Sequence, residues 1–144
     1  MLEISQGSAI DAYSVAKNIP EFSDGHYGLD EYKKRLGSDS LILIAHYQGT
    51  PAGFKAGYPR GKAGSFYSWM GGVLPNFRRK GIAQKLAINQ EAWAKDQGYT
   101  SIWFKTRNRN RTMIIFALNN GFDIIQVEPK DQVLDHRILM EKTL

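Results

Sequence analysis

Residues 73–83 read V-L-P-N-F-R-R-K-G-I-A, and this segment sets the architecture that we expect for the chain. It joins a segment with strand character, 65–74, to an amphipathic pattern that predicts a helix from Ile82 onward. A helix N-terminus presents unpaired N–H groups and a partial positive charge, and Gly81 has no Cβ to keep an anion away from them. Three basic residues, 78–80, lie beside the same amides. The segment therefore predicts a strand-to-helix turn that binds a phosphate group.

Two other phosphate-binding loops do not match the sequence. A P-loop needs a glycine five positions before Gly-Lys-Ser/Thr, but Gly61-Lys62 is followed by Ala63, and position 56 is alanine. The dinucleotide fingerprint G-x-G-x-x-G does not occur. The pattern that remains is R-x-x-G-x-A at 78–83, preceded by V-x-P at 73–75.

The periodicities of the whole chain predict one α/β domain over residues 1–144, with elements in the order β-α-α-β-β-β-α-β-α-β-β. The expected strands are 2–4, 41–47, 52–58, 65–74, 101–106, 122–127 and 138–142, and the expected helices are 8–18, 30–36, 82–97 and 108–120. Hairpin signals early and late in the chain predict antiparallel pairing there. The apolar residues at helical spacing in the third helix are Ile82, Leu86, Ile88, Trp93 and Ala94. Gly71-Gly72 predicts a bulge or a close backbone approach.

The composition favours a soluble globular protein. Its 144 residues are 42% hydrophobic and 23% charged, and the absence of cysteine excludes disulfides, thiolate metal sites and a cysteine nucleophile. The net charge of +5 favours anionic partners. The longest apolar runs, 41–45 and 113–118, are far shorter than the about 20 residues that span a bilayer. The N-terminus lacks the features of a signal peptide, so we expect a cytoplasmic protein that makes no membrane contact.

Two sequence blocks resemble a known family. Val73-x-Pro75 followed by Arg78-x-x-Gly81-x-Ala83 is similar to the acetyl-CoA-binding motif of the GNAT-type N-acetyltransferases. Asn110-x-x-Met113, with Gly121-Phe122 behind it, resembles the asparagine-containing helix and the Gly-Phe ending of the same family. The order of strands and helices also fits, so the resemblance covers essentially the whole chain.

This resemblance implies a mixed, mostly antiparallel and splayed sheet flanked by about four helices. It also implies acetyl-CoA as co-substrate and no metal, with the pantetheine arm in the gap of the sheet and the pyrophosphate on the turn. The residues expected to bind acetyl-CoA are Gly72, Val73, Leu74, Arg78, Arg79, Lys80, Gly81, Ile82, Ala83, Asn110 and Phe116.

The implied reaction is acetyl transfer to a primary amine by direct attack in a ternary complex. The backbone N–H of Val73 is the expected donor to the oxyanion that develops on the thioester carbonyl. The amine must lose a proton, so a base near the acceptor is required. The candidates in the early loop are Glu21, Asp24 and His26, and Tyr67 is expected to position the amine.

The sequence departs from the family pattern at two places. Ala117 stands where many members carry the tyrosine that protonates the leaving thiolate, and strand 65–72 holds no acid. A catalytically degenerate acetyl-CoA-binding module is therefore a second interpretation. A basic nucleic-acid-binding domain is a third, because R-N-R-N-R at 107–111 offers phosphate contacts, but no recognition motif accompanies it. The acceptor, a small molecule or a peptide amine, stays open, as does a homodimer through exposed strand edges.

Overall fold

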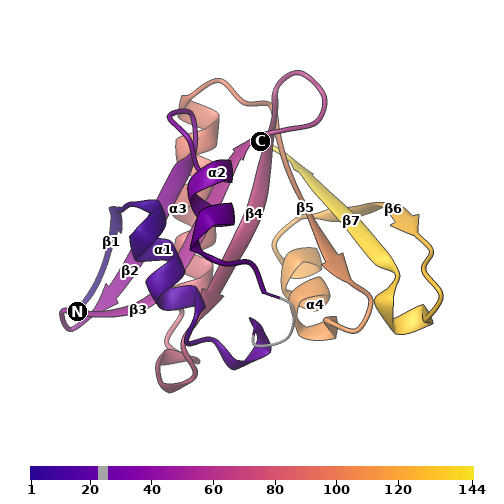
Figure 1. Ribbon diagram of the computed structural model, residues 1–144. Coiled ribbons are helices and arrows are strands. Elements are labelled where there is room, and N and C mark those ends of the chain that lie inside the picture. The colour runs from indigo at the N-terminus through magenta and orange to yellow at the C-terminus, as the bar shows by residue number, and fades with distance from the viewer. Residues whose placement is uncertain (23–25) are drawn as a thin grey trace.

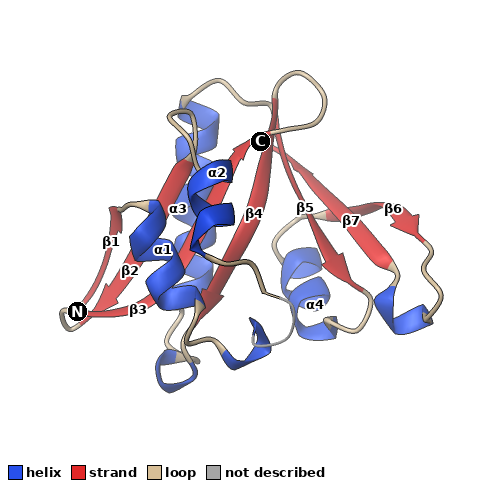
Figure 2. Cartoon of the chain, in the orientation of Figure 1, coloured by secondary structure: helices blue, strands red, loops and turns tan. Residues whose placement is uncertain are grey.

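The computed structural model describes residues 1–22 and 26–144, and its centre is one seven-stranded sheet (Figure 1, Figure 2). The order across the sheet is β1-β2-β3-β4-β5-β7-β6. The strands are β1 (Leu2–Gln6), β2 (Leu41–Tyr47), β3 (Thr50–Pro59), β4 (Ser65–Val73), β5 (Ser101–Arg107), β6 (Asp123–Glu128) and β7 (Arg137–Thr143). Among these strands only β4 and β5 run parallel, and every other neighbouring pair is antiparallel. The predicted mixed, mostly antiparallel architecture is confirmed.

Helices cover both faces of this sheet. They are α1 (Ala9–Ala16), α2 (Leu29–Arg35), α3 (Ile82–Asp96) and α4 (Arg111–Asn119), and short 3₁₀ turns occupy Pro20–Phe22, Pro75–Phe77 and Val133–Asp135. α1 and α2 lie across the front of the sheet in Figure 1, and α3 lies behind it. α4 packs against β5 and β7 on the side of α3. Within the described residues, no helix has both the length and the apolar character that crossing a membrane requires.

The buried side of α3 differs from the predicted one. The buried residues are Ile82, Leu86, Ala87, Gln90 and Ala94. Ile88 is 57% exposed, so its assignment to the apolar stripe was wrong. Positions 82, 86, 90 and 94 lie on one line along a helix of 3.6 residues per turn, and a polar side chain occupies one of them. Gln90 thus enters the core where sequence hydrophobicity did not place it.

α4 begins at Arg111, three residues later than predicted. The residues before it are tied to another segment instead: the N–H of Asn108 donates to the carbonyl of His136 at 2.8 Å, and that of Arg109 donates to the carbonyl of Leu134 at 3.0 Å. These bonds tie the loop after β5 to the segment before β7. Asn110 is left at the N-cap position of the helix.

The parallel strands β4 and β5 form a fork. They pair only at Ser65–Tyr67 with Ser101–Trp103, and beyond these residues the two strands diverge (Figure 1). We call this arrangement the fork. Its paired residues form the closed end, and its divergent part is the open end. The register of β4 against β3 shifts at Ala56/Gly57, which makes Trp69 the extra residue of β4.

The bulge is therefore not at Gly71-Gly72, where the sequence suggested it, because both glycines keep regular register with β3. The other predicted role, a close approach, fits Gly72: a Cβ there would lie 2.6 Å from Cδ1 of Ile19. The bulge depends instead on Gly57, where a Cβ would lie 2.3 Å from the carbonyl oxygen of Tyr67 and 2.6 Å from the ring of Phe66.

Gly57→Ala is expected to lower the free energy of unfolding by about 1–3 kcal/mol, because the added methyl group meets backbone that cannot move without breaking the bulge. Gly37→Ala is the matched control, since a Cβ at Gly37 meets nothing within 4 Å. Urea denaturation of both variants measures the difference. Equal stabilities of the two variants would contradict this account of the bulge.

Candidate functional site

The turn between β4 and α3 presents a row of free backbone N–H groups. Gly81 adopts a left-handed conformation (φ 77°), as does Arg79 (φ 63°), and α3 begins without a side-chain cap. No acceptor in the described part of the chain takes the N–H groups of residues 79–84. Arg78 is different, because its N–H donates to the carbonyl of Pro75 at 3.3 Å. The free donors thus start at Arg79 and continue into the first turn of α3.

The side chain of Arg78 holds this turn in place. Its Nε donates to the carbonyl oxygen of Val73 at 2.9 Å, and its two terminal nitrogens donate to the carboxylate of Glu21, each at 2.9 Å. These charge-assisted bonds lower the pKa of Glu21. The turn is thereby fixed both to the end of β4 and to the 3₁₀ turn after α1. Glu21, a candidate base from the sequence, is engaged as the partner of an arginine.

The end of β4 turns part of its backbone toward the fork. Leu74 donates to the carbonyl of Ala52 at 2.8 Å, and hydrogen bonding alternates along an antiparallel pair. The register pairs Val73 with Gly53 and Gly71 with Lys55, so the N–H groups of Val73 and Gly71 point away from β3 and toward the side that β5 has left. Gly72 and Leu74 point toward β3.

Of Gly72, Val73 and Leu74, which are all expected to bind acetyl-CoA, only Val73 thus has its N–H on the fork side. Gly71 shares this orientation, and the sequence analysis missed it. The two-residue repeat of a strand, counted back from Val73, was the signal that could have found it.

On the other side of the fork, α4 supplies Asn110 and Phe116. The amide Nδ2 of Asn110 donates to Oγ1 of Thr106 at 3.0 Å, and its side chain does not cap the helix. Phe116 is half-buried and lines a small cavity between α3 and α4. Ala117 is buried beside it. Both Asn110 and Phe116 remain predicted contacts of acetyl-CoA.

His26 and Tyr67 lie on the face of the sheet that α1 and α2 cover. His26 stacks on Phe22, with ring centroids 4.7 Å apart, and its Nε2 lies 2.7 Å from the hydroxyl of Tyr32. Burial lowers the pKa of His26, which favours the neutral imidazole. Tyr67 is 5% exposed, and burial raises its pKa. Asp24 lies outside the described residues.

Aromatic and arginine side chains gather on this side of the sheet, and we call this group of residues the aromatic face. Its members are Tyr27, Tyr58, Tyr67, Trp69, Trp103, Arg35 and Arg60. Arg35 lies over Tyr27 and Trp69, and Arg60 lies over Tyr67 and Trp103, at 4.8–5.8 Å from the ring centroids. The Nε1 of Trp103 donates to the carbonyl of Arg60 at 2.8 Å, which anchors the basic loop after β3.

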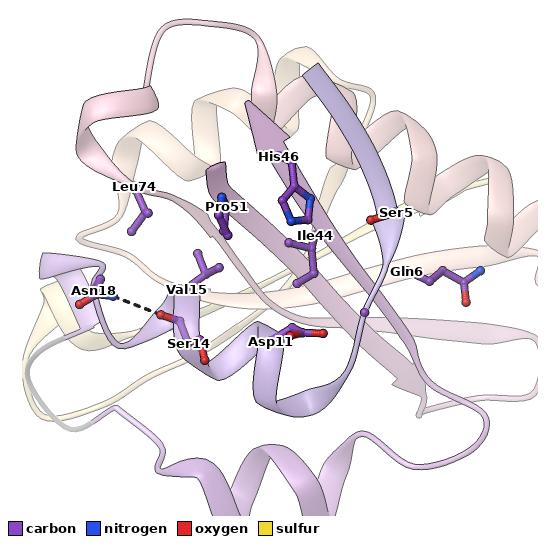
Figure 3. Close-up of a pocket in the computed structure, with 11 residues that line it drawn as sticks. Ser5, Gln6, Asp11, Ser14, Val15, Asn18, Ile44, His46, Pro51 and Leu74 are labelled. Atoms are coloured by element: carbon purple, nitrogen blue, oxygen red, sulfur yellow. Dashed lines mark hydrogen bonds between the residues drawn. The ribbon is translucent and has the colours of Figure 1, made fainter. Parts of the chain in front are cut away.

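A larger hollow of about 370 Å³ lies between β1, α1 and β2 (Figure 3). Most of its polar groups serve α1 itself. Asp11 closes a capping box with Ser8, Ser14 Oγ donates to the carbonyl of Ile10 at 2.8 Å, and Asn18 Nδ2 donates to that of Ser14 at 3.2 Å. Because these groups are locally satisfied, the free donors at the fork are the better candidate site.

The ion pair of Glu21 and Arg78 predicts a small, pH-dependent contribution to stability. Because the folded pKa of Glu21 is depressed, the contribution is present above the unfolded pKa near ~4.3 and is lost as pH falls through the folded pKa. The carboxylate is 60% exposed, so Glu21→Gln should cost less than about 1 kcal/mol at pH 7. Denaturant titrations of both proteins from pH 7 to pH 3 test this; a difference that grows on acidification would contradict it.

The chain was compared with known proteins. A family model described as the acetyltransferase (GNAT) family matches residues 9–122. The search of curated proteins found no match.

Among solved structures, the ribosomal-protein-S18-alanine N-acetyltransferase of Escherichia coli is similar at TM-score 0.85 and 17% identity, covering 99% of this chain and 94% of that one. The PaiA N-acetyltransferase of Thermoplasma acidophilum, solved in complex with coenzyme A, is similar at TM-score 0.77 and 19% identity, covering 100% and 99%. An acetyltransferase of Bacillus subtilis in complex with CoA gives TM-score 0.78 and 16% identity, with the same coverages. These structures show the fold, and the family model, which spans most of the sequence, shows that the chain belongs to the acetyltransferase (GNAT) family.

Proposed function

We propose that this acetyltransferase moves the acetyl group of acetyl-CoA to the primary amine of a small molecule or peptide, by direct attack in a ternary complex. The observation that carries the proposal is the row of free N–H groups at residues 79–84, at the head of α3 and next to the fork. Two structural relatives were solved with coenzyme A, which supports acetyl-CoA as the co-substrate.

The residues at the turn fit a diphosphate group. A helix N-terminus with free amides favours anions, and the exposed Arg79 and Lys80 add positive charge there. A Cβ at Gly81 would meet nothing within 4 Å, so the surface in front of these amides is open. The backbone N–H groups would bind the pyrophosphate. Asn110 and Phe116 would contact the pantetheine arm from α4.

The chain's own groups have separate roles in this proposal. Bound acetyl-CoA supplies an activated acetyl group. The N–H of Val73, on the fork side of β4, would stabilise negative charge on the carbonyl oxygen. Since Glu21 is engaged with Arg78, His26 would accept the amine proton, directly or through water, and Tyr67 would position the amine.

The aromatic face favours an acceptor that also carries an anionic group. Arg60 is exposed at its edge, and Lys105 and Arg107 follow Trp103 along β5. These charges would repel a polyamine and attract a carboxylate or phosphate. The aromatic side chains would contact the apolar part of the same molecule. We therefore propose amino acids or acidic peptides as the acceptor class.

Gly81→Glu is expected to abolish binding of CoA, because a carboxylate would occupy the place of the pyrophosphate. Gly98→Glu is the matched control: Gly98 has a similar φ (93°) and equally open surroundings, but it lies at the opposite end of α3. Isothermal calorimetry with CoA measures both affinities. Gly81→Glu binding as tightly as Gly98→Glu would count against the site, since a loss of at least about tenfold, ~1.4 kcal/mol, is expected.

A panel of amines tests the acceptor class by release of CoA thiol. An amine that carries a carboxylate should have a higher kcat/KM than a neutral amine of the same size, and spermidine should be poorest. Arg60→Gln should lower kcat/KM for the carboxylated amine by about tenfold, as expected for the loss of one charge-assisted hydrogen bond of ~1.5 kcal/mol, and leave the neutral amine unchanged. Lys33→Gln, an exposed change on α2, is the control. Preference for spermidine would contradict the acceptor class, and no turnover above hydrolysis with any amine would contradict transfer itself.

A further inference from the structure

A small cavity of about 20 Å³ lies at the fork, between α3 and α4. Its walls come from five elements and are formed by Lys55, Ser68, Ala87, Gln90, Glu91, Phe104, Met113, Phe116, Ala117, Asn120 and Phe122. Ser68 and Phe104 are the first residues beyond the last paired residues of the fork, Tyr67 and Trp103. The cavity therefore lies directly behind the point where the sheet opens.

Gln90 makes this cavity chemically unusual. It is 0% exposed, and neither its Nε2 nor its Oε1 has a hydrogen-bond partner in the described part of the chain. Leaving a buried amide unsatisfied costs about 1–3 kcal/mol per group, so such a side chain favours a polar guest. The cavity volume exceeds the roughly 10–15 Å³ that one water needs. Gln90 is thus placed to hold a water or a polar ligand group there.

Lys55 reaches the same cavity from β3. It is opposite Gly71 in the register, and its Cγ lies 3.3 Å from the position that a Cβ of Gly71 would take. The missing side chain of Gly71 thus leaves room for the lysine stem. The N–H of Gly71 also points to the fork, so the stem of Lys55 lies against a residue whose backbone faces the fork.

The ammonium group of Lys55 makes no hydrogen bond or ion pair within the described residues. The other titratable residue of the cavity wall, Glu91 from α3, is held by Lys142 of β7 at 2.7 Å. Burial lowers the pKa of Lys55 to about 8, and the charge of Glu91 opposes this shift. α4 and its C-cap residue Asn120 contribute only Met113, Phe116, Ala117 and Asn120 to the wall, none of which titrates.

We propose that Lys55 supplies the proton that the departing CoA sulfur takes up during acetyl transfer, through the cavity that Gln90 and Ser68 line. This inference rests on the proposed function. As the carbon–sulfur bond breaks, its electron pair stays on sulfur; an N–H bond of Lys55 breaks and an S–H bond forms, directly or through a water held by Gln90. Lys55 is left as a neutral amine and regains a proton from solvent, which balances the proton that the acceptor amine has released.

The acidity of the group suits this task. A thiol in water has a pKa near ~8.5, and proton transfer is most effective when donor and acceptor are matched near the working pH. An ordinary lysine, near ~10.4, would hold its proton too firmly. Ala117 contributes only a methyl group to the α4 wall of this cavity.

The first test measures bound product rather than turnover. The pKa of the thiol of enzyme-bound CoA is followed by the ultraviolet absorbance of its thiolate as pH is varied. In the wild-type protein the Lys55 ammonium should lower this pKa by about one unit relative to free CoA. Lys55→Met should remove that shift, and Lys55→Arg should keep it. Lys95→Met, an exposed change on α3, should behave as wild type.

The second test is the pH profile of kcat. Wild-type kcat should fall above a pH of about 8, as Lys55 loses its proton. In Lys55→Met, kcat should no longer fall at high pH, and it should be lower than that of wild type by roughly 10²-fold at neutral pH. Lys55→Arg should remain slow, because a guanidinium does not release its proton in this range.

Desulfo-CoA separates failure of this inference from failure of the proposed function. Because it lacks the sulfur, it should bind wild type and Lys55→Met equally. If wild type binds neither desulfo-CoA nor CoA, the proposed function is wrong. If wild type binds and transfers acetyl groups but Lys55→Met matches it in thiol pKa and in pH profile, Lys55 is only structural and this inference is overturned.

Discussion

The constraint on which this structure depends is the brief parallel contact between β4 and β5. Every other neighbouring pair among the described strands is antiparallel, and this one holds for only three register pairs before the strands separate. The crossover helix α3 connects them, since parallel neighbours cannot be joined by a tight turn. The bulge at Trp69 increases the local twist and carries β4 away. The result is unpaired strand edge in the middle of a sheet, where backbone polar groups need a partner.

Different contacts hold the two ends of the fork. Ser65 and Ser101 are both buried and their hydroxyl groups lie 3.0 Å apart across the two strands, and Thr100 donates to the carbonyl of Gly64 at 2.8 Å. At the open end the backbone of Val73 is fixed instead by Arg78, which also holds Glu21. The two faces of the sheet differ: α3 and α4 border the fork on one face, and the aromatic face lies on the other. This separation suits a reaction that brings together two different molecules.

The sequence predicted what depends on neighbouring residues and failed on what depends on distant ones. The order of elements, the antiparallel hairpins and the turn before α3 follow from local periodicity and from glycine, and they are confirmed. The sequence suggested a bulge at Gly71-Gly72 because a glycine pair in a strand is compatible with one. Its actual position depends on Gly57 in the neighbouring strand β3. The pairing of Arg78 with Glu21 joins residues 57 positions apart, and no local pattern indicates it. Gln90 enters the core because helix geometry places it in line with the buried apolar residues of α3, such as Leu86 and Ala94.

In the proposed site, backbone N–H groups would bind acetyl-CoA and the oxyanion, whereas side chains would select the acceptor and supply the final proton. Binding of a diphosphate by N–H groups requires a left-handed Gly81 and a helix start, and orientation of the Val73 N–H requires only the strand path. Such requirements constrain few side chains. The fold itself is shared, at TM-score 0.85, with a protein only 17% identical in sequence. In these proposals the aromatic face and Lys55 act through their side chains, so variation there would change the acceptor, or the source of the final proton, without disturbing the fork.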